Sequence, residues 1–375
     1  MSTHWQVWDA DVDQHRQSWT DLWWKSPMQH PFAHPDVCRL LGPGNGRLMA
    51  ATIVDGTGHV LYPFFVREID PGESQDGDSG TFPRRDIVSP YGYGGPLHWG
   101  LDDVEASAKV FWAEFGTWAR AQSIVSEFVR FSLFDEDVLP YPGPTRTRQA
   151  NYVRELDVPA EDLWQGVESK VRRNARRALR EGVSIIVDDR GAYVEDFLRI
   201  YLGTMDRCAS AEWYRFDRSF FARLHAALPG RFAYVLAQLK GEIVSADLLL
   251  LSADTGYYFL GGTQASSFST RPNDLVKVEA MNWLRETGRR RYVLGGGVQP
   301  QDGLERYKRG FAPRGAVDFS TGERILSPRC YDALVAGTRR RFSSSGVEWD
   351  ESDDFFPAYR RTMPSTLETM GGTTS

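Results

Sequence analysis

The sequence predicts a mixed α/β fold, with mixed α+β sheets, made of two tandem copies of one domain. Its 375 residues are too many for a single ordinary hydrophobic core and favour two domains of usual size. Hydrophobic residues make up 41% and charged residues 25% of the chain, which is typical of a soluble globular protein. A faint internal repeat indicates that the two domains are alike.

The first copy of the repeat begins with two strands joined by a turn. Residues 48–54 and 60–66 are apolar runs of strand length, and the turn at 55–58 contains two glycines. Apolar residues at helical spacing then predict a helix over 104–121, and a short apolar run predicts a strand over 128–131.

The second copy repeats this order of elements, although few residues are identical between the copies. Its first two strands are again joined by a turn with a glycine, at 240–242. The predicted elements are strands over 232–239, 243–251 and 257–261, a helix over 274–286 and a strand over 292–294.

The boundary between the predicted domains lies in the segment Val158-Pro159-Ala160-Glu161, where proline interrupts regular structure. A helix that runs from about Leu163 into a cluster of arginines opens the second domain. We therefore expect an N-terminal domain over 1–158, a C-terminal domain over 159–342 and an acidic, partly disordered tail over 343–375.

Two segments have the composition of irregular structure. Residues 70–83 are rich in Asp, Gly, Ser and Pro and predict an exposed loop. The predicted tail mixes polar residues with a few aromatic side chains, and we expect Trp349, Phe355 and Phe356 to fix it to the rest of the protein.

The charge balance limits the classes of partner. A formal net charge of −6 and a pI near 5.7 argue against broad electrostatic attraction to nucleic acid or to anionic membranes, so any contact with a polyanion must be local. No apolar run approaches the roughly 20 residues of a spanning helix, and the N-terminal residues do not resemble a secretion signal. We expect a cytoplasmic protein without a membrane span.

The cysteines and histidines do not form a metal-binding pattern. Cys38, Cys208 and Cys330 are odd in number and widely spaced, which predicts reduced thiols of a cytosolic protein. The seven histidines do not group at ligand spacing. The sequence motifs of serine hydrolases, zinc proteases, P-loop nucleotide hydrolases and dinucleotide-binding dehydrogenases do not occur. The sequence therefore predicts neither a metal nor a redox cofactor.

A strongly basic helix is predicted over 170–182. Its apolar stripe consists of Val171, Ala175, Ala178, Leu179 and Gly182, of which the last is also a suitable helix stop. Its other face carries Arg172, Arg173, Arg176, Arg177 and Arg180. Five guanidinium groups on one face repel one another, and an anion such as phosphate would offset their charge. The alternative is a solvated helix face without a ligand.

Two glycine-rich runs provide further candidate binding residues. The run 89–96 contains three glycines and two prolines, so its backbone can approach a ligand closely. Within it, Tyr91, Tyr93 and Gly94 are candidates for substrate binding. The alternative is a tight loop between strands with packed tyrosines.

The second run ends the last predicted strand with three glycines, of which Gly296 and Gly297 are candidate binding residues. The carboxyl ends of strands in α/β folds commonly admit ligands. A short helix after this run carries Tyr307, Lys308 and Phe311, and a fixed lysine there can stabilise a developing oxyanion or hold a phosphate. The alternative is a purely structural turn.

Taken in order, these segments resemble the Fem peptidyltransferase (FemABX) family and the related GNAT-fold acyltransferases with a doubled domain. The resemblance rests on the loop 89–96, the helix 170–182, the helix 274–288 with the run 292–297, and residues 304–311. It implies two GNAT-like domains that face a shared cleft, no metal or redox cofactor, and formation of an amide from an activated acyl group and an amine.

The Fem resemblance also implies partners and residue roles. The donor would be an aminoacyl-tRNA, and the acceptor a peptidoglycan precursor or, in natural-product relatives, a small amine. Lys308 matches the lysine that steadies the charged carbonyl or the tRNA end, and Tyr307 stands where the family usually has Phe. Arg172, Arg173 and Arg176 match a phosphate-facing element.

The expected chemistry needs few side chains, because an aminoacyl ester is already activated and positioning supplies much of the acceleration. A general base could still take a proton from the attacking amine. The available carboxylates are Asp302, Glu305, Asp247 and Glu279. Asp302 is a candidate catalytic residue, but which carboxylate, if any, is the base is not predicted. Sustained heptads do not occur after the basic helix, so the coiled-coil arm common in the Fem family is expected to be missing.

Three classes of function stay open. CoA-dependent GNAT domains usually carry a glycine-rich loop that binds pyrophosphate, and the matching residues 264–273 contain no glycine, which favours aminoacyl-tRNA. The second class uses acyl-CoA or an acyl carrier protein on the same fold. The third is a non-catalytic module that binds a phosphorylated ligand on the arginine helix. The donated group, the acceptor amine and the oligomeric state are not predicted.

Overall fold

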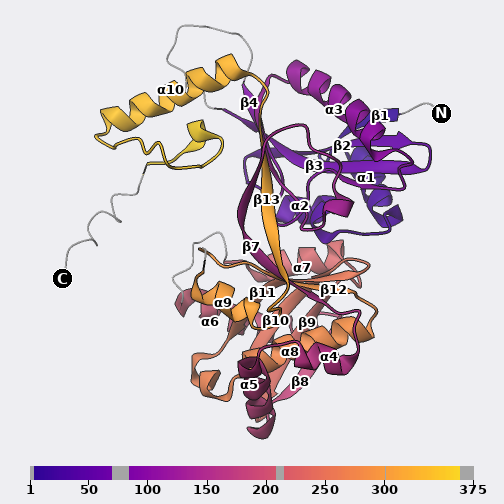
Figure 1. Cartoon of the computed structure of the whole chain (residues 1–375), viewed down its shortest axis with the longest axis vertical. Helices are drawn as coiled ribbons and strands as arrows, with labels where there is room; N and C mark the ends of the chain where they lie inside the picture. Colours follow the sequence, from indigo (N-terminus) through magenta and orange to yellow (C-terminus); the bar gives the residue numbers. More distant parts are fainter. Residues whose placement is uncertain (1–3, 70–83, 208–214, 300, 364–375) are drawn as a thin grey trace. The chain divides into compact units, whose positions relative to one another are not determined.

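A computed structural model describes residues 4–69, 84–207, 215–299 and 301–363 of the chain. The chain divides into two compact units, which Figure 1 shows in colours that follow the sequence. Unit 1 comprises Met1–Arg16, Gly42–Arg146 and Thr321–Ser375, and unit 2 comprises Gln17–Leu41 and Thr147–Ser320. The loop predicted over 70–83 and Cys208 lie outside the described residues.

Unit 1 is built on a mixed sheet with the strand order β1-β2-β3-β4-β6-β13. Neighbouring strands are antiparallel, except that β4 and β6 run parallel. The strands are β1 (His4–Asp9), β2 (Gly46–Asp55), β3 (Gly58–Glu68), β4 (Arg85–Val88), β6 (Ile124–Arg130) and β13 (Ala316–Ile325), and β5 (Leu97–Trp99) pairs with β3. Helix α3 (Val104–Ala121) packs on the sheet through Phe111 and Phe115, whose rings contact Tyr62 and Phe64 of β3.

Unit 2 is built on a mixed sheet with the order β8-β9-β10-β11-β12-β7. Its neighbouring strands are antiparallel, except that β11 and β12 run parallel. The strands are β7 (Thr145–Glu155), β8 (Ser184–Asp188), β9 (Phe232–Leu239), β10 (Glu242–Leu251), β11 (Thr255–Thr263) and β12 (Arg291–Gly295). The position of the parallel pair is the same in both units, which confirms the predicted fold of two like α/β domains.

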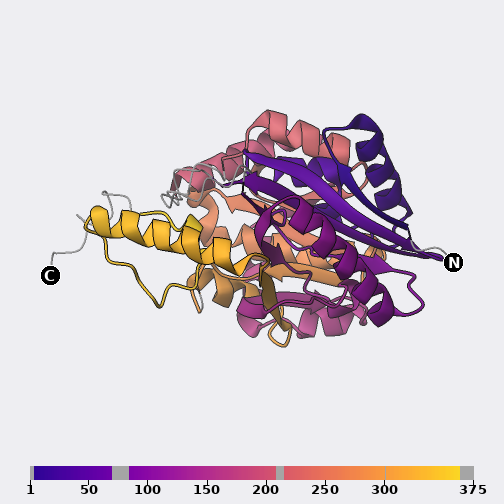
Figure 2. The ribbon, with the colours of Figure 1, turned by 90° about the horizontal axis from the view of Figure 1, so that it is seen from above.

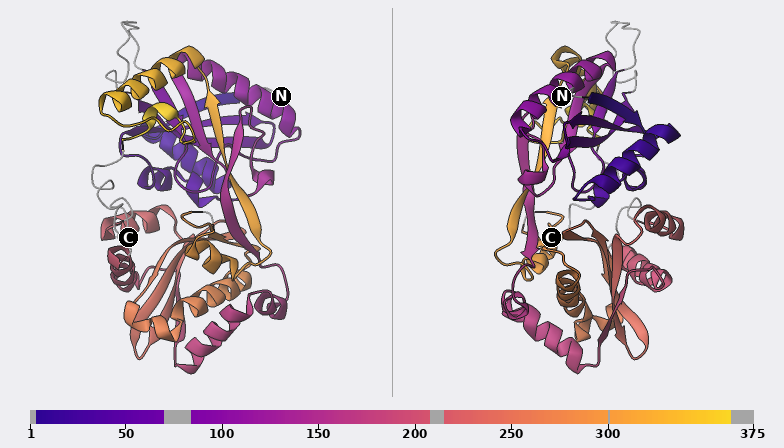
Figure 3. Two further views of the ribbon diagram at one scale, coloured as in Figure 1. Left: turned by 60° about the vertical axis from the view of Figure 1, so that its left-hand side comes forward. Right: turned by 90° about the vertical axis from the view of Figure 1, so that its right-hand side faces the viewer.

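Helices lie on both faces of the unit 2 sheet (Figure 3). Helix α8 (Pro272–Glu286) packs on β9 and β10, and α5 (Ser169–Arg180) packs on α8. Helix α6 (Val194–Arg207) packs on β10 and β11, and α7 (Arg218–Ala227) packs on α6. Helix α8 is buried on more than one side, with every residue of 274–278 buried, because it packs on both the sheet and α5.

The helix predicted from Leu163 through the arginine cluster is two helices. Helix α4 (Ala160–Gln165) ends at Gly166, and α5 begins three residues later. The last carbonyl groups of α4 take side-chain donors: Arg154 donates to the main-chain oxygens of Asp162 and Leu163, and Arg172 donates to that of Gln165.

The predicted stop of the arginine helix is confirmed. Gly182 adopts a φ of +84°, and the N–H of Val183 returns to the carbonyl of Ala178, which is the usual closure of a helix that ends in glycine. Leu179, expected in the apolar stripe, is 56% exposed. It is rotated by about 100° from Ala178 and by about 40° from Ala175, which places it at the edge of the buried face.

The stretches that make up each unit differ from the predicted domains. The segment Gln17–Leu41, predicted in the N-terminal domain, belongs to unit 2, where α2 (Pro35–Leu40) packs on α7. His30 Nε2 of this segment lies 3.1 Å from the hydroxyl of Tyr257 on β11. The edge strands are also exchanged, since β7 joins the sheet of unit 2 and the later half of β13 joins that of unit 1. Periodicity predicts a strand but does not identify its partner.

The segment predicted as a tail is part of unit 1 as far as it is described. It follows α10 (Pro328–Ser344), and Figure 2 shows both in yellow. Of the aromatic residues expected to fix it, Trp349 and Phe356 make ring contacts, and Phe355 is exposed. Tyr359 is fully buried and donates a hydrogen bond to a buried carboxylate of β4. Residues 364–375 lie outside the described part.

The cysteines that the structure describes carry free thiols. Cys38 is buried, which raises the pKa of its thiol, and Cys330 is half-buried. Among the described residues, no group of His, Cys, Asp and Glu side chains is arranged to hold a metal ion. Within the same ranges, no helix combines the length and the apolar character needed to cross a membrane.

Candidate functional site

Strands β11 and β12 of unit 2 separate at their carboxyl ends. They pair only through Thr255–Tyr257 and Arg291–Val293, whereas β11 continues to Thr263. In sheets with parallel strands, ligands bind outside the carboxyl ends where neighbouring connections diverge. The segments that follow β11 and β12 are therefore the place in unit 2 where a site is expected.

Helix α9 (Gly303–Arg309) follows β12 and carries Lys308 into a buried position. Lys308 is 7% exposed, and its Nζ donates a hydrogen bond to the main-chain oxygen of Gly296 at 2.6 Å. Burial, and after it the nearby ammonium of Lys277, lowers the pKa of Lys308 to about 8. The side chain is therefore mainly cationic at neutral pH and loses its proton in mildly alkaline solution.

A second buried lysine lies next to the first. Lys277 of α8 is 4% exposed and forms an ion pair with Asp247 of β10, which is 5% exposed. The Nζ atoms of Lys277 and Lys308 lie 3.6 Å and 5.6 Å from the centre of the Tyr258 ring, within the range of cation–π attraction. Two ammonium groups therefore share one carboxylate and one aromatic ring.

Sequence reasoning named Asp247 as an available carboxylate but missed Lys277. The signal was present, because Lys277 lies three residues before Ala280 and four before Met281, both of which are buried on α8. A lysine on the apolar stripe of a helix is almost never fully buried unless it is paired.

Tyr307 and Phe311 lie beside this cluster. The hydroxyl of Tyr307 accepts a hydrogen bond from Asn273 Nδ2 of α8 at 3.0 Å, and its ring packs edge-on against Phe311 at 5.0 Å. Phe311 is fully buried and belongs to the hydrophobic core of unit 2. On β12, the buried hydroxyl of Tyr292 has no hydrogen-bond partner among the described residues, which is unusual for a buried polar group.

Asp302 is placed as the N-cap of α9. Its Oδ1 accepts a hydrogen bond from Glu305 N at 2.7 Å, and its Oδ2 accepts from Val298 N at 2.7 Å and Gln299 N at 3.1 Å. These backbone hydrogen bonds lower the pKa of Asp302 to about 2. A carboxylate with that pKa is a weak base, so its evident role is to hold the loop and α9 in place.

Gly296 and Gly297 are required by close contacts. A Cβ on Gly296 would lie 2.6 Å from the oxygen of Ala150, and one on Gly297 would lie 2.6 Å from Asp302 Oδ1. Neither position has room for a side chain. Gly296 also supplies the carbonyl oxygen that holds Lys308.

The arginines of α5 have different surroundings. Arg172 is half-buried and holds the end of α4 through two main-chain oxygens. The guanidinium of Arg176 lies 5.3 Å from the centre of the Trp164 ring. Arg173 is exposed. Of the three candidate phosphate contacts, Arg172 therefore has a structural role already, and Arg173 is exposed.

The remaining candidates belong to unit 1, in the connection between β4 and β5. Tyr91 is exposed, and burial raises the pKa of the Tyr93 hydroxyl. The main-chain oxygen of Gly94 accepts a hydrogen bond from Ser132 N at 2.7 Å. The structure therefore brings Lys308, Tyr307, Asp302, Gly296 and Gly297 together in unit 2 and places these three residues in unit 1.

Unit 1 has a buried charged cluster of a different kind. Glu127 of β6, the strand that corresponds to β12, accepts hydrogen bonds from the hydroxyls of Tyr62 at 2.8 Å and Tyr141 at 3.1 Å. Arg324 forms an ion pair with it at 2.9 Å. The carboxylate is thus fully satisfied, which suits a structural role. We therefore take the two buried lysines beside the diverging ends of β11 and β12 in unit 2 as the candidate active site.

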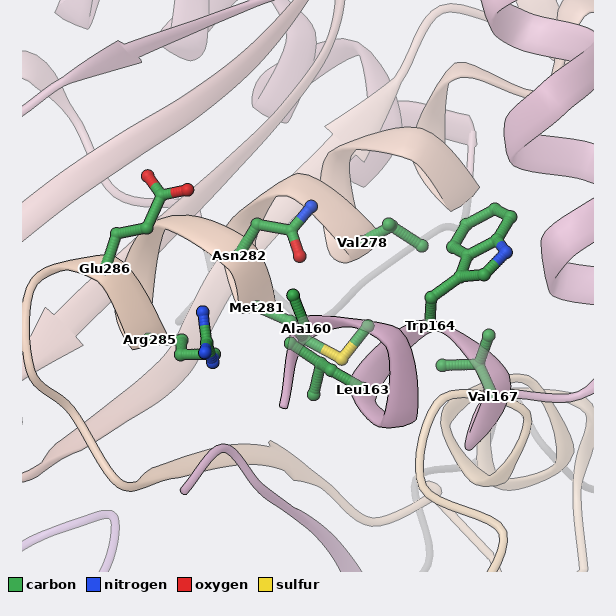
Figure 4. Close-up of a pocket in the computed structure, with 9 residues that line it drawn as sticks. All are labelled: Ala160, Leu163, Trp164, Val167, Val278, Met281, Asn282, Arg285 and Glu286. Carbon is green, nitrogen blue, oxygen red and sulfur yellow. The ribbon is translucent and has the colours of Figure 1, made fainter. Parts of the chain in front are cut away.

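A cavity of about 340 Å³ lies between α4 and α8 (Figure 4). Its walls include Leu163, Trp164 and Met281, and Arg285 at its edge donates a hydrogen bond to the oxygen of Val158 at 2.8 Å. Lys308 and the other site residues do not line it. We attribute this cavity to the packing of two helices rather than to chemistry.

Comparison with known proteins finds a related domain within unit 2. Residues 166–309 match the family model described as an acetyltransferase (GNAT) domain, a range that contains both lysines. The chain is similar to the crystal structure of FemX, with a TM-score of 0.59 and 14% identity over 84% of this chain and 97% of that one. The protein has a FemX-like, doubled GNAT fold. The resemblance seen in the sequence is therefore confirmed at the level of fold.

Other solved structures share the FemX-like fold. One is the C-terminal domain of an Agrobacterium fabrum protein assigned as a lysylphosphatidylglycerol synthetase, with a TM-score of 0.53 and 15% identity over 90% of this chain and 99% of that one. Another is a conserved protein of unknown function from Bacteroides thetaiotaomicron, with a TM-score of 0.53 and 13% identity over 85% and 100%. No curated protein matches the chain in sequence.

Proposed function

We propose that the protein is an amide-forming transferase that moves an aminoacyl group from an aminoacyl-tRNA to the amine of a small molecule or a cell-wall precursor. The observation that carries this proposal is the buried Lys308, which Gly296 holds at the carboxyl ends of β11 and β12. The GNAT match over 166–309 and the FemX-like fold support acyl transfer.

In the proposed reaction, the acceptor amine attacks the ester carbonyl of the donor. The amide C–N bond forms, the C–O bond to the ribose breaks, and the proton lost by the amine ends on the leaving hydroxyl. Negative charge develops on the carbonyl oxygen, and a fixed ammonium stabilises it in a site with little water. Lys308 has three N–H donors, and Gly296 takes one of them. The others are available to the oxyanion.

The first turn of α8 favours a donor other than CoA. An N-terminus that binds pyrophosphate does so with free N–H groups, but α8 begins with Pro272, which has none. Asp274 is buried in the same turn and accepts a hydrogen bond from Asn174 Nδ2 at 3.2 Å. When ionised, this carboxylate repels a diphosphate. The connection before α8 is a short 3-10 helix, Ala265–Thr270, rather than a glycine-rich loop.

The donor class is tested by mixing the purified protein with charged tRNA and a panel of amines, with the amide product detected by mass spectrometry. We expect product from the untreated mixture and none after ribonuclease treatment. The matched control is Lys308→Met with the same charged tRNA. Product that survives ribonuclease treatment contradicts an aminoacyl-tRNA donor.

A second candidate is an N-acyltransferase that uses acyl-CoA or an acyl carrier protein. The observation that favours it is the match of residues 166–309 to the acetyltransferase (GNAT) family model. CoA esters would then raise the melting temperature of the protein, and charged tRNA would not. Amide formation from a CoA ester alone would establish this candidate.

A further inference from the structure

Two buried ammonium groups and one buried carboxylate form an unbalanced cluster in unit 2. Lys277, Lys308 and Asp247 are each less than 10% exposed, and Lys277 is paired directly with Asp247. When ionised, these three groups together carry one net positive charge away from water, and Asp274, a further buried carboxylate of α8, also acts on Lys277. Such a charge is costly unless another group offsets it.

We propose that the Lys277–Asp247 ion pair is a positioning pair for Lys308. By occupying Asp247, Lys277 keeps the Lys308 ammonium on the Gly296 oxygen and leaves its charge to be offset by an anionic oxygen of the reacting substrate. Neither member of the pair needs to touch the substrate. This role rests on the proposed acyl transfer, whereas the electrostatic coupling is a property of the protein alone.

The geometry supports this division of roles. Lys277 Nζ lies closer to the Tyr258 ring than Lys308 Nζ does, 3.6 Å against 5.6 Å. Lys308 instead takes the carbonyl of Gly296 as its hydrogen-bond acceptor. Without Lys277, a buried carboxylate would be left unpaired next to a second ammonium. The charged groups that act on Lys308 are Lys277 from α8, Asp247 from β10 and Asp302, the N-cap of its own helix, and its Nζ lies over the ring of Tyr258 from β11.

The coupling is tested without a substrate, by ¹³C NMR titration of the protein with labelled lysine side chains. The Lys308 signal is assigned by its loss in Lys308→Met. In Lys277→Met, Lys308 loses a repelling neighbour, so its titration midpoint is expected to rise from about 8 by about one pH unit. Met281→Leu, which alters the same helix without changing charge, is the control and leaves the midpoint in place.

A second variant covers the case in which the unpaired carboxylate prevents folding. Lys277→Met/Asp247→Leu replaces the pair by apolar side chains, which buried ion pairs often tolerate. The effect of Lys277 on the pKa of Lys308 outweighs that of Asp247, so the midpoint again rises, but by less. An unchanged or lowered midpoint in the folded variants overturns the proposal.

Steady-state kinetics then separate positioning from mere stability. We expect Lys277→Met to lower kcat for amide formation about tenfold or more with an unchanged KM for the amine. The pH profile of kcat is expected to follow the NMR midpoint, and Lys277→Arg to restore part of both. A shifted midpoint with wild-type kcat overturns the positioning role. A shifted midpoint with no amide product from any variant or from the wild type contradicts the proposed function instead.

Discussion

Lys308 Nζ donates a hydrogen bond to the main-chain oxygen of Gly296 at 2.6 Å. The loop after β12 therefore fixes a buried cation with a main-chain carbonyl. Unlike a carboxylate side chain, this acceptor cannot be protonated at ordinary pH or rotate away. If this cation stabilises the oxyanion, its removal must reduce the rate of transfer without unfolding the protein.

Lys308→Met is expected to reduce kcat for amide formation by about 10²- to 10³-fold, the usual effect of losing one oxyanion donor. Methionine has a similar length and no charge, so the core of unit 2 is retained. The rate is measured under saturating donor and acceptor, with circular dichroism to confirm the fold. A variant with nearly wild-type kcat would exclude Lys308 from the chemistry.

The lowered pKa of Lys308 gives the stability a defined pH dependence. The folded-state pKa is about 8, against 10.5 for the exposed side chain. Between these values the unfolded state binds more protons, so this group makes the folded state more stable as pH rises, by up to about 1.4 kcal/mol per pH unit. Below pH 8 its contribution is constant.

This dependence is measured by urea unfolding at pH 7, 8, 9 and 10. Lys308→Met lacks the titrating group, so the wild type should gain stability relative to it above pH 8. Groups common to the two proteins cancel in the difference. Parallel curves over the whole range would show that Lys308 titrates normally.

Two substitutions of Asp302 distinguish a helix N-cap from a general base. Asp302→Ala removes the acceptors for three backbone N–H groups, so α9 loses its fixed start and the activity should fall about tenfold or more. Asp302→Asn keeps one acceptor oxygen for the N-cap and should retain most of the activity. If Asp302 is a general base, both variants lose activity equally.

Arg172 and Arg173 are neighbours, but their removal is expected to affect stability differently. Arg172→Ala removes hydrogen bonds to Gln165 and Val167 and should lower the free energy of unfolding by about 1–3 kcal/mol. Arg173→Ala changes an exposed side chain and should alter it by no more than about 0.5 kcal/mol.

If the basic helix contacts tRNA, Arg173→Ala weakens the binding of tRNA. The slope of log affinity against log salt concentration then becomes shallower by about one unit, because one phosphate contact is lost. Filter binding with charged tRNA at several salt concentrations measures this. An unchanged slope would assign Arg173 to a solvated helix face.

The ion pair between Lys277 and Asp247 should also contribute to the free energy of unfolding. Lys277→Met alone leaves Asp247 unpaired and is expected to cost about 3–5 kcal/mol, whereas Lys277→Met/Asp247→Leu should cost much less. Urea unfolding of the single variants and the double variant gives the coupling energy. Additive losses would mean that the two side chains do not interact in solution.

The fold was largely accessible from the sequence. Apolar periodicity and glycine turns located β2, β3, β9 and β10 and the helices α3 and α8, because these elements bury a face defined by local spacing. The exchange of β7 and β13 between the units was not accessible, since strand pairing depends on distant residues.

The candidate site was predicted in part. Lys308, Tyr307 and the glycines stand close together in sequence, so a motif could indicate them. Lys277 and Asp247 are 30 residues apart, and their pairing depends on how α8 packs on β10. Tyr91 and Tyr93 came from composition alone, and the structure assigns them to unit 1, whereas Lys308 belongs to unit 2.

The position of β13 has a consequence for biosynthesis. Its later half, Thr321–Ile325, is the partner of β6 in unit 1, yet the ribosome reaches it only after the whole of unit 2 has been made. During synthesis, β6 of unit 1 is therefore an unpaired edge strand that can pair wrongly. All strands of unit 2, through β12, are made before β6 gains its partner. A premature stop before residue 321 would thus leave the sheet of unit 1 incomplete, although most of unit 1 is translated first.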